Sequence, residues 1–176
     1  MKINVFGATL QAGVLAGLFA EHGHQVFWCP NELVREDQIH YQNEDVNYLI
    51  EQQVASGFLN LGSFGELPLD NDVHVFSYAA TEQNRALALL DCIQQIAVKP
   101  KGLFINGSTF GLHGTEQLKQ KLNTENWAYL PDIIQEGNAL GSFTYAKQVI
   151  VGVDHDAVKS MMQELLRPFF QFQHQY

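Results

Sequence analysis

The opening of the chain constrains its fold more than any other segment. An apolar strand at residues 3–6 ends at Gly7, and apolar residues at helical spacing follow it directly. A second glycine, Gly23, closes that helix before the next apolar run. A strand that meets a helix through a glycine turn, with another strand following, is the start of a βαβ unit.

The alternation of strand and helix continues to the end of the chain. Strands are expected at 25–29, 58–61, 73–78, 103–106, 127–130 and 148–153, and helices at 44–56, 82–97, 115–122 and 155–167. Such alternation predicts an α/β fold, a Rossmann-like, doubly wound and mostly parallel sheet with helices on both faces. Since 46% of the 176 residues are hydrophobic and twelve are Phe, one domain spanning 1–176 can bury a sizeable core.

Charge and composition exclude several classes of function. The net charge of −9 disfavours nucleic acid and anionic membranes as partners. No run of 18 apolar residues is present, so no membrane span is expected. Asn4, Thr9 and Gln11 interrupt the apolar N-terminal stretch that could pass for a secretion signal. We therefore expect a cytoplasmic protein.

Cysteine and histidine usage suggests no disulfide framework and no metal site. Cys29 and Cys92 form no CxxC pair, and both are expected to be buried thiols. The seven histidines show no ligand spacing; His22 and His24 flank a turn, and His113 stands alone in a loop. No metal is expected.

The first turn resembles a dinucleotide-binding fingerprint with one element missing. The pattern G-x-G-x-x-G/A would place its glycines at Gly7, at position 9 and at position 12. Here Thr9 replaces the second glycine, which lets the backbone approach a diphosphate, and Ala12 is a tolerated third residue. Two interpretations of Thr9 remain open: its hydroxyl caps the following helix, or it still contacts phosphate.

Ligands of parallel sheets bind at the carboxyl ends of the strands, so the residues that follow each strand are the site candidates. The ribose-binding acid belongs at the end of the second strand, where Pro30 offers no acceptor and Glu32 is expected to be a solvated loop acid. Tyr78 is a further candidate to line the crevice. The candidate cofactor contacts are Gly7, Thr9, Leu10, Gln11, Ala12, Asn31, Ala80, Thr81, Ser108 and Thr109.

Five segments, taken in order, resemble the UDP-glucose/GDP-mannose (nucleotide-sugar) 6-dehydrogenase family, specifically its N-terminal NAD-binding domain. They cover roughly residues 1–170. They are MKINVFGATLQAGVLAGLFAEHGHQV, NYLIEQQVASGFLNLGSF, the Gly107-Ser108-Thr109 loop with Gly114-Thr115, LPDIIQEGNAL and KQVIVGVD. The resemblance implies NAD as cofactor, although Thr9 and Pro30 replace the second loop glycine and the ribose acid.

The resemblance also implies a catalytic role for Thr109, Asp132 and Glu136. In the family the corresponding threonine helps to hold a water, and the carboxylate pair helps to hydrolyse a thioester intermediate. A helical turn over 132–137 would place both carboxylates on one face, whereas an exposed helix start is the alternative. Asp132 is one methylene shorter than the family's glutamate.

The family's nucleophilic cysteine lies in a second domain, and this sequence ends at Tyr176 before that domain would begin. We therefore expect no catalysis by this chain alone. Three functions remain open: a free-standing nucleotide-binding module, an NAD-dependent oxidoreductase subunit that acts on a nucleotide sugar when a partner chain completes it, and a ligand-free protein-interaction scaffold. For the scaffold, the aromatic segment Phe169-Phe170-Gln171-Phe172 would contact a protein partner; its alternative role is packing on the domain's own sheet.

Overall fold

A computed structural model describes residues 1–96 and 101–170. Seven strands form one sheet in the order β3-β2-β1-β4-β5-β6-β7, and all neighbours are parallel except β6 and β7. The strands are β1 (Lys2–Phe6), β2 (Gln25–Cys29), β3 (Leu59–Leu61), β4 (Val73–Phe76), β5 (Leu103–Asn106), β6 (Trp127–Tyr129) and β7 (Gly152–Val153). The predicted α/β class with a doubly wound, mostly parallel sheet is confirmed.

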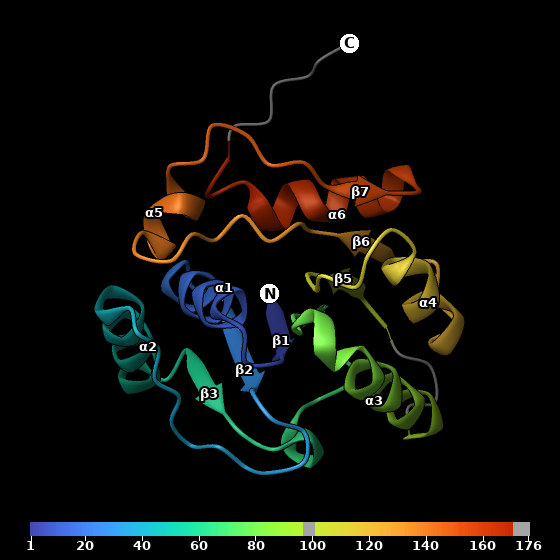
Figure 1. The fold of residues 1–176 in the computed structure, drawn as a ribbon, viewed down its shortest axis with the longest axis horizontal. Helices are drawn as coiled ribbons and strands as arrows, with labels where there is room; N and C mark the ends of the chain where they lie inside the picture. The colour runs from blue at the N-terminus through green and yellow to red at the C-terminus, as the bar shows by residue number, and fades with distance from the viewer. Residues whose placement is uncertain (97–100, 171–176) are drawn as a thin grey trace.

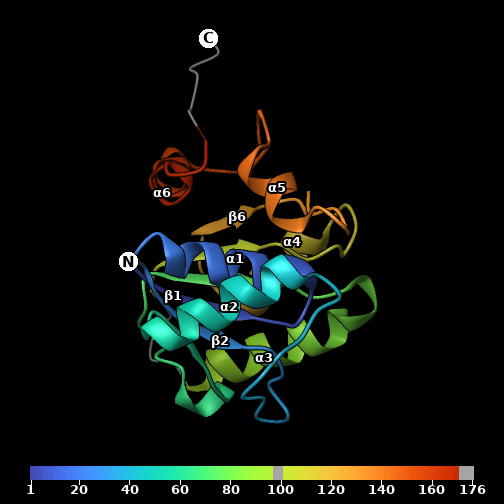
Figure 2. The same cartoon turned by 90° about the vertical axis from the view of Figure 1, so that its left-hand side faces the viewer.

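Helices cover both faces of this sheet (Figure 1). The helices are α1 (Leu10–Glu21), α2 (Glu44–Ser56), α3 (Gln83–Ile96), α4 (Gly114–Lys121), α5 (Ala139–Thr144) and α6 (Asp156–Leu166), with short 3-10 turns η1 (Phe64–Glu66) and η2 (Ala80–Glu82). Figure 2 shows α1 and α2 side by side; they pack on one face of the sheet, and α3 packs on the other. None of the helices in the described ranges is long and apolar enough to cross a membrane.

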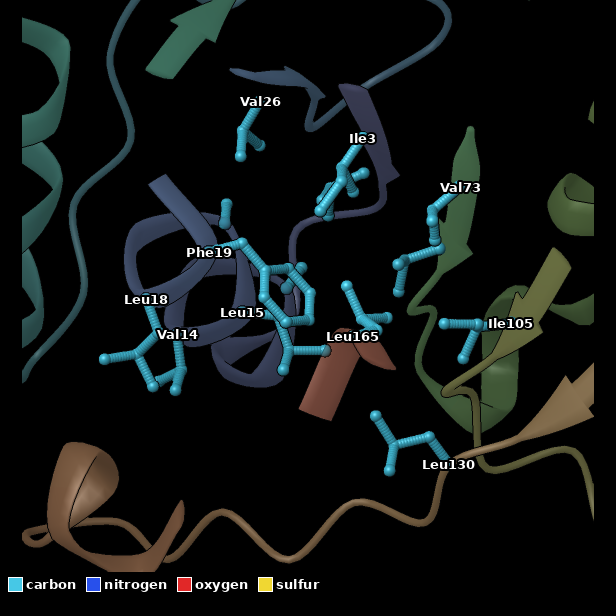
Figure 3. Packing of buried hydrophobic residues seen from close by; sticks show 14 of the residues in the cluster. Ile3, Val14, Leu15, Leu18, Phe19, Val26, Val73, Ile105, Leu130 and Leu165 are labelled. Atoms are coloured by element: carbon cyan, nitrogen blue, oxygen red, sulfur yellow. The ribbon is translucent and has the colours of Figure 1, made fainter. Parts of the chain in front are cut away.

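Two hydrophobic clusters form the core, one on each face. The larger lies between α1 and the sheet, where Phe19, Leu15 and Ile3 pack together, and Leu165 of α6 joins them (Figure 3). The smaller lies under α3 and α4 and is rich in aromatic side chains, among them Phe76 and Trp127. Along β1, Ile3 and Val5 belong to one cluster and Phe6 to the other, as expected for a strand buried on both faces.

Phe169 and Phe170 pack against the domain itself. The Phe169 ring meets Phe19 and Phe143 edge to face, at centroid distances of 6.1 and 5.3 Å. Phe170 is buried and contacts Phe143 in the same way. Phe172 of the same aromatic segment lies outside the described residues.

Three local expectations are corrected. Residues 132–137 form no helical turn, because the Asp132 carboxylate accepts the Ile134 amide at 2.9 Å and the helix begins only at Ala139. The last strand is shorter than 148–153, since its partner β6 ends at Tyr129 and only Gly152 and Val153 pair with it. Cys29 is buried as expected, but Cys92 is exposed on α3.

Candidate functional site

The turn between β1 and α1 requires glycine at its first position. Gly7 has a φ of +106°, and a Cβ at this position would lie 2.0 Å from the Ser77 carbonyl oxygen. The Gly7 carbonyl oxygen accepts a hydrogen bond of 2.8 Å from Nε1 of the buried Trp28. The first glycine of the fingerprint therefore brings the turn against β4 and ties it to β2.

Thr9 is the N-cap of α1. Its hydroxyl accepts the Ala12 amide at 3.1 Å, and its backbone is extended, with φ −63° and ψ 159°. The helix-cap interpretation is confirmed, and a residue with a Cβ fits here without left-handed strain. The same amide at the helix N-terminus would otherwise be available to an anion.

A polar network covers the carboxyl ends of several strands. Gln11 is buried, and its Oε1 accepts a hydrogen bond of 2.7 Å from the Ser77 hydroxyl. The Ser77 hydroxyl also bonds the Thr9 hydroxyl, and Gln11 Nε2 reaches the Pro131 carbonyl oxygen at 3.5 Å. Gly107 leaves room for this side chain, because a Cβ at that position would lie 2.6 Å from Gln11 Oε1. The Gln11 side chain thus extends from α1 across the edge of the sheet to the segment after β6.

Tyr41 covers the turn from the other side, and the sequence gives no signal for it. Its hydroxyl bonds the carbonyl oxygens of Thr9 (2.9 Å) and Ala8 (3.2 Å). Its ring lies nearly parallel to that of Trp28 and fills the space left by Gly13, whose Cβ would meet the ring at 2.5 Å. Burial raises the pKa of Tyr41, so the hydroxyl stays protonated and donates.

An ion pair joins the segments that follow β2 and β4. Arg85 at the start of α3 donates from Nε and Nη2 to the two carboxylate oxygens of Glu32, at 2.8 and 3.0 Å. The Glu32 side chain is only 10% exposed, so the expectation of a solvated loop acid is wrong. Arg85 also bonds Glu82, and its guanidinium lies 5.9 Å from the ring centre of the buried Tyr78. The two residues are 53 positions apart, and no sequence pattern predicts that they pair.

Four further candidate cofactor contacts, Asn31, Ala80, Thr81 and Leu10, lie outside the polar network and the ion pair described above. The side-chain oxygen Oδ1 of Asn31 accepts a hydrogen bond of 3.0 Å from the Leu33 amide, as is typical of an Asx turn. Ala80 and Thr81 are exposed in η2. Leu10, at the first position of α1, is half-buried against the larger core cluster.

Ser108 and Thr109 follow β5 but have different surroundings. Ser108 is buried; its hydroxyl donates to the Phe76 carbonyl oxygen (3.1 Å) and accepts the Tyr78 amide (2.9 Å). It therefore bridges the ends of β4 and β5. Thr109 is exposed one residue further along.

Thr109 and Asp132 lie at corresponding positions beyond the ends of two neighbouring strands, β5 and β6. Asn106 of β5 pairs with Tyr129 of β6, and each candidate lies three residues beyond its strand's paired residue. Asp132 and Glu136 are both exposed, although partial desolvation raises the pKa of Asp132 above its ordinary value. The carboxyl ends of β5 and β6 are thus followed by an exposed hydroxyl, that of Thr109, and an exposed carboxylate, that of Asp132, whereas Glu136 lies further along the chain.

Within residues 1–96 and 101–170, no group of three His, Cys, Asp or Glu side chains could hold a metal ion. His113 is exposed, with its Nδ1 3.3 Å from a carboxylate oxygen of Glu116.

No protein-family model and no curated protein matches the sequence, but solved structures match its fold closely. A UDP-glucose dehydrogenase from Pyrobaculum islandicum gives a TM-score of 0.79 at 18% identity, over 96% of this chain and 44% of that one. The chain shares its fold with nucleotide-sugar dehydrogenases. GDP-mannose dehydrogenase from Pseudomonas aeruginosa gives a TM-score of 0.75 at 15% identity. UDP-N-acetyl-mannosamine dehydrogenase from Staphylococcus aureus gives 0.76 at 19%.

The match covers 96% and 97% of this chain in these two cases, but only 44% and 46% of the solved chains. The chain therefore spans less than half the length of the dehydrogenases it resembles. The sequence resemblance to their N-terminal domain is confirmed at the level of the fold.

Proposed function

We propose that this chain is a nucleotide-binding module of the type found in nucleotide-sugar dehydrogenases, and that it does not catalyse alone. The observation that carries the proposal is the strand order, in which β1 lies between β2 and β4 and leads through Gly7 into α1. In doubly wound sheets the crevice at this switch point, facing the helix N-terminus, receives the diphosphate of a nucleotide.

The residues of the turn do not fit NAD well. The Thr9 hydroxyl takes the Ala12 amide, and Gln11 and Ser77 form a network across the strand ends. At the end of β2, Pro30 has neither an N–H group nor a side-chain acceptor for a ribose hydroxyl. We expect the affinity for NAD to be low, because a diphosphate would have to replace hydrogen bonds that the protein already makes within itself.

Neither cysteine is suited to act as the nucleophile of an alcohol-to-acid oxidation. Burial raises the pKa of the Cys29 thiol to about 11, so almost no thiolate forms at neutral pH. The helix α3 begins after the carboxyl end of β4, and Cys92 lies nine residues beyond its first residue, a rise of about 14 Å along the helix. The properties of these two thiols support the proposal that the chain does not carry out this oxidation alone.

Isothermal titration calorimetry against NAD, UDP-glucose and GDP-mannose, supported by thermal shift, tests the proposal. A ligand at ten times its Kd raises the unfolding free energy by about 1.4 kcal/mol, so millimolar screening detects weak binding. Thr9→Gly should tighten NAD binding by freeing the Ala12 amide, whereas Thr9→Ser keeps the cap and should leave the affinity unchanged. Micromolar affinity of the unaltered chain for NAD would contradict the expected low affinity for NAD. If none of the three nucleotides bound, the proposed nucleotide-binding function would be contradicted.

The exposed edge of β5 and β6 favours a second candidate function, an NAD-dependent oxidoreductase subunit that a partner chain completes. Thr109 and Asp132 are exposed just beyond the carboxyl ends of two neighbouring strands, at the edge where substrates of such sheets bind. Mixing the chain with a domain that supplies the nucleophilic cysteine should then restore NADH production from a nucleotide sugar. Asp132→Asn should abolish that production, and Asp154→Asn, which removes an exposed carboxylate elsewhere, should not.

A further inference from the structure

We infer that Arg85 selects nucleotides that carry a phosphate on the ribose, so that the site prefers an NADP-type ligand to NAD. The inference rests on the proposed nucleotide-binding function and names its ligand class. Doubly wound sheets hold the ribose of the first nucleoside at the carboxyl end of β2.

The end of β2 presents no unengaged acceptor for a pair of ribose hydroxyls. Pro30 carries no polar side-chain atom, and the side-chain oxygen of Asn31 accepts the Leu33 amide. The nearest carboxylate, that of Glu32, is held by Arg85 through both of its oxygens. The usual recognition of an unphosphorylated ribose, by a carboxylate that accepts its hydroxyls, therefore conflicts with an ion pair that already exists.

A guanidinium stands at this end in a fixed orientation. Arg85 lies over the ring of the buried Tyr78 and bonds Glu82 on the adjacent turn, which restricts its plane. Its side chain is 36% exposed, whereas that of Glu32 is 10% exposed, so solvent and ligands reach the arginine more readily than its partner. A planar guanidinium binds carboxylate and phosphate with the same two-point geometry.

Glu32 can therefore be exchanged for a phosphate. It lies in the long segment between β2 and α2, in a stretch without regular secondary structure, whereas Arg85 is anchored within α3. A phosphate dianion that displaces the carboxylate restores both hydrogen bonds to Arg85, whereas a ribose hydroxyl restores them only as weaker neutral contacts. In this arrangement Glu32 occupies the place of the ligand's phosphate when no nucleotide is bound.

Calorimetric titration of NADP and NAD against matched variants tests this assignment. The unaltered chain should bind NADP at least about tenfold more tightly than NAD, the effect of one charge-assisted two-point contact. Glu32→Gln should tighten NADP binding further without a comparable gain for NAD, because it removes the competing charge. Arg85→Gln should abolish the preference. Arg35→Gln and Asp37→Asn, which remove exposed charges from the same segment, should leave it unchanged.

Circular dichroism and thermal melting establish that each variant is folded before it is titrated. Equal affinity for NADP and NAD in both the unaltered chain and Glu32→Gln would overturn the role of Arg85 and leave the proposed nucleotide-binding function intact. If the folded chain and its variants bound neither dinucleotide nor a nucleotide sugar, the proposed function would fail, and this inference with it.

Discussion

Asn4 and His74 share a buried hydrogen bond of 3.2 Å between Asn4 Nδ2 and His74 Nδ1. On the other side of the ring, His74 Nε2 lies 3.1 Å from the Lys101 carbonyl oxygen. An amide N–H can only donate and a carbonyl can only accept, so these partners fix the neutral ring with its proton on Nε2. Protonation of Nδ1 would place two donors against each other in the core.

The first prediction concerns the stability of the fold in acid. Burial lowers the pKa of His74 from 6.5 to about 4. Between these two pH values, the His74 ring is protonated in the unfolded chain but neutral in the folded chain. The neutral His74 ring therefore adds to the free energy of unfolding, and this stabilisation is fully present above pH 6.5. It is lost as the pH falls from 6.5 to about 4, and the total loss is on the order of 3 kcal/mol. Urea unfolding at several pH values across this window measures it.

His74→Gln should flatten that pH dependence, because the titrating group is gone. His113→Gln, which removes an exposed imidazole, is the matched control and should retain the slope. Parallel curves for the unaltered chain and His74→Gln would show that His74 does not carry the effect.

The second prediction compares two glycines with left-handed backbone. Gly7→Ala places a Cβ within 2.0 Å of a backbone oxygen and should cost more than about 3 kcal/mol of unfolding free energy. At Gly23, with φ +89°, no atom lies within 4 Å of the added Cβ, so Ala there should cost only about 1–2 kcal/mol. Chemical denaturation of both variants measures the difference, and equal losses would mean that contact with β4 is unimportant.

The third prediction concerns thiol reactivity. Ellman's reagent should modify one cysteine per folded chain at once, the exposed Cys92, and Cys92→Ser should abolish this rapid phase. Cys29 should react only as fast as the chain unfolds, since it is fully buried and its thiolate is disfavoured. Rapid modification of both thiols in the folded protein would contradict the burial of Cys29.

The fourth prediction separates packing from partner binding in the C-terminal aromatic segment. Phe170→Ala should cost about 3–5 kcal/mol, because the ring is buried and meets Phe143 at 5.3 Å. Tyr145→Ala, at a residue that is 86% exposed, should change stability by no more than about 0.5 kcal/mol. Thermal melting checks both, and an unchanged melting temperature for Phe170→Ala would favour a partner-contact role for the segment.

The sequence predicts those features that depend on local pattern. The strands at 25–29 and 103–106 and the helix at 44–56 occur with these bounds, because apolar spacing and flanking Gly or Pro residues define them. The cap at Thr9 is predictable for the same reason, since an N-cap depends on residues within one turn.

Features that depend on distant partners could not be predicted. The Glu32–Arg85 pair and the contact of Tyr41 with Gly13 join residues far apart in the chain, and neither shows a periodic pattern. Neither the helical turn nor the helix start considered at residues 132–137 occurs, because a side chain–backbone bond at Asp132 competes with helix formation. Helix propensity alone does not decide this outcome.

The bond between the Trp28 indole and the Gly7 carbonyl oxygen gives the molecule an internal optical reporter. The chain contains only two tryptophans, and the other, Trp127, lies in β6 on the opposite face of the sheet. Replacing Trp127 by Phe would leave a single emitter attached to the first turn. Its emission wavelength would then register, in real time and without a label, any rearrangement that occurs where β1 meets α1.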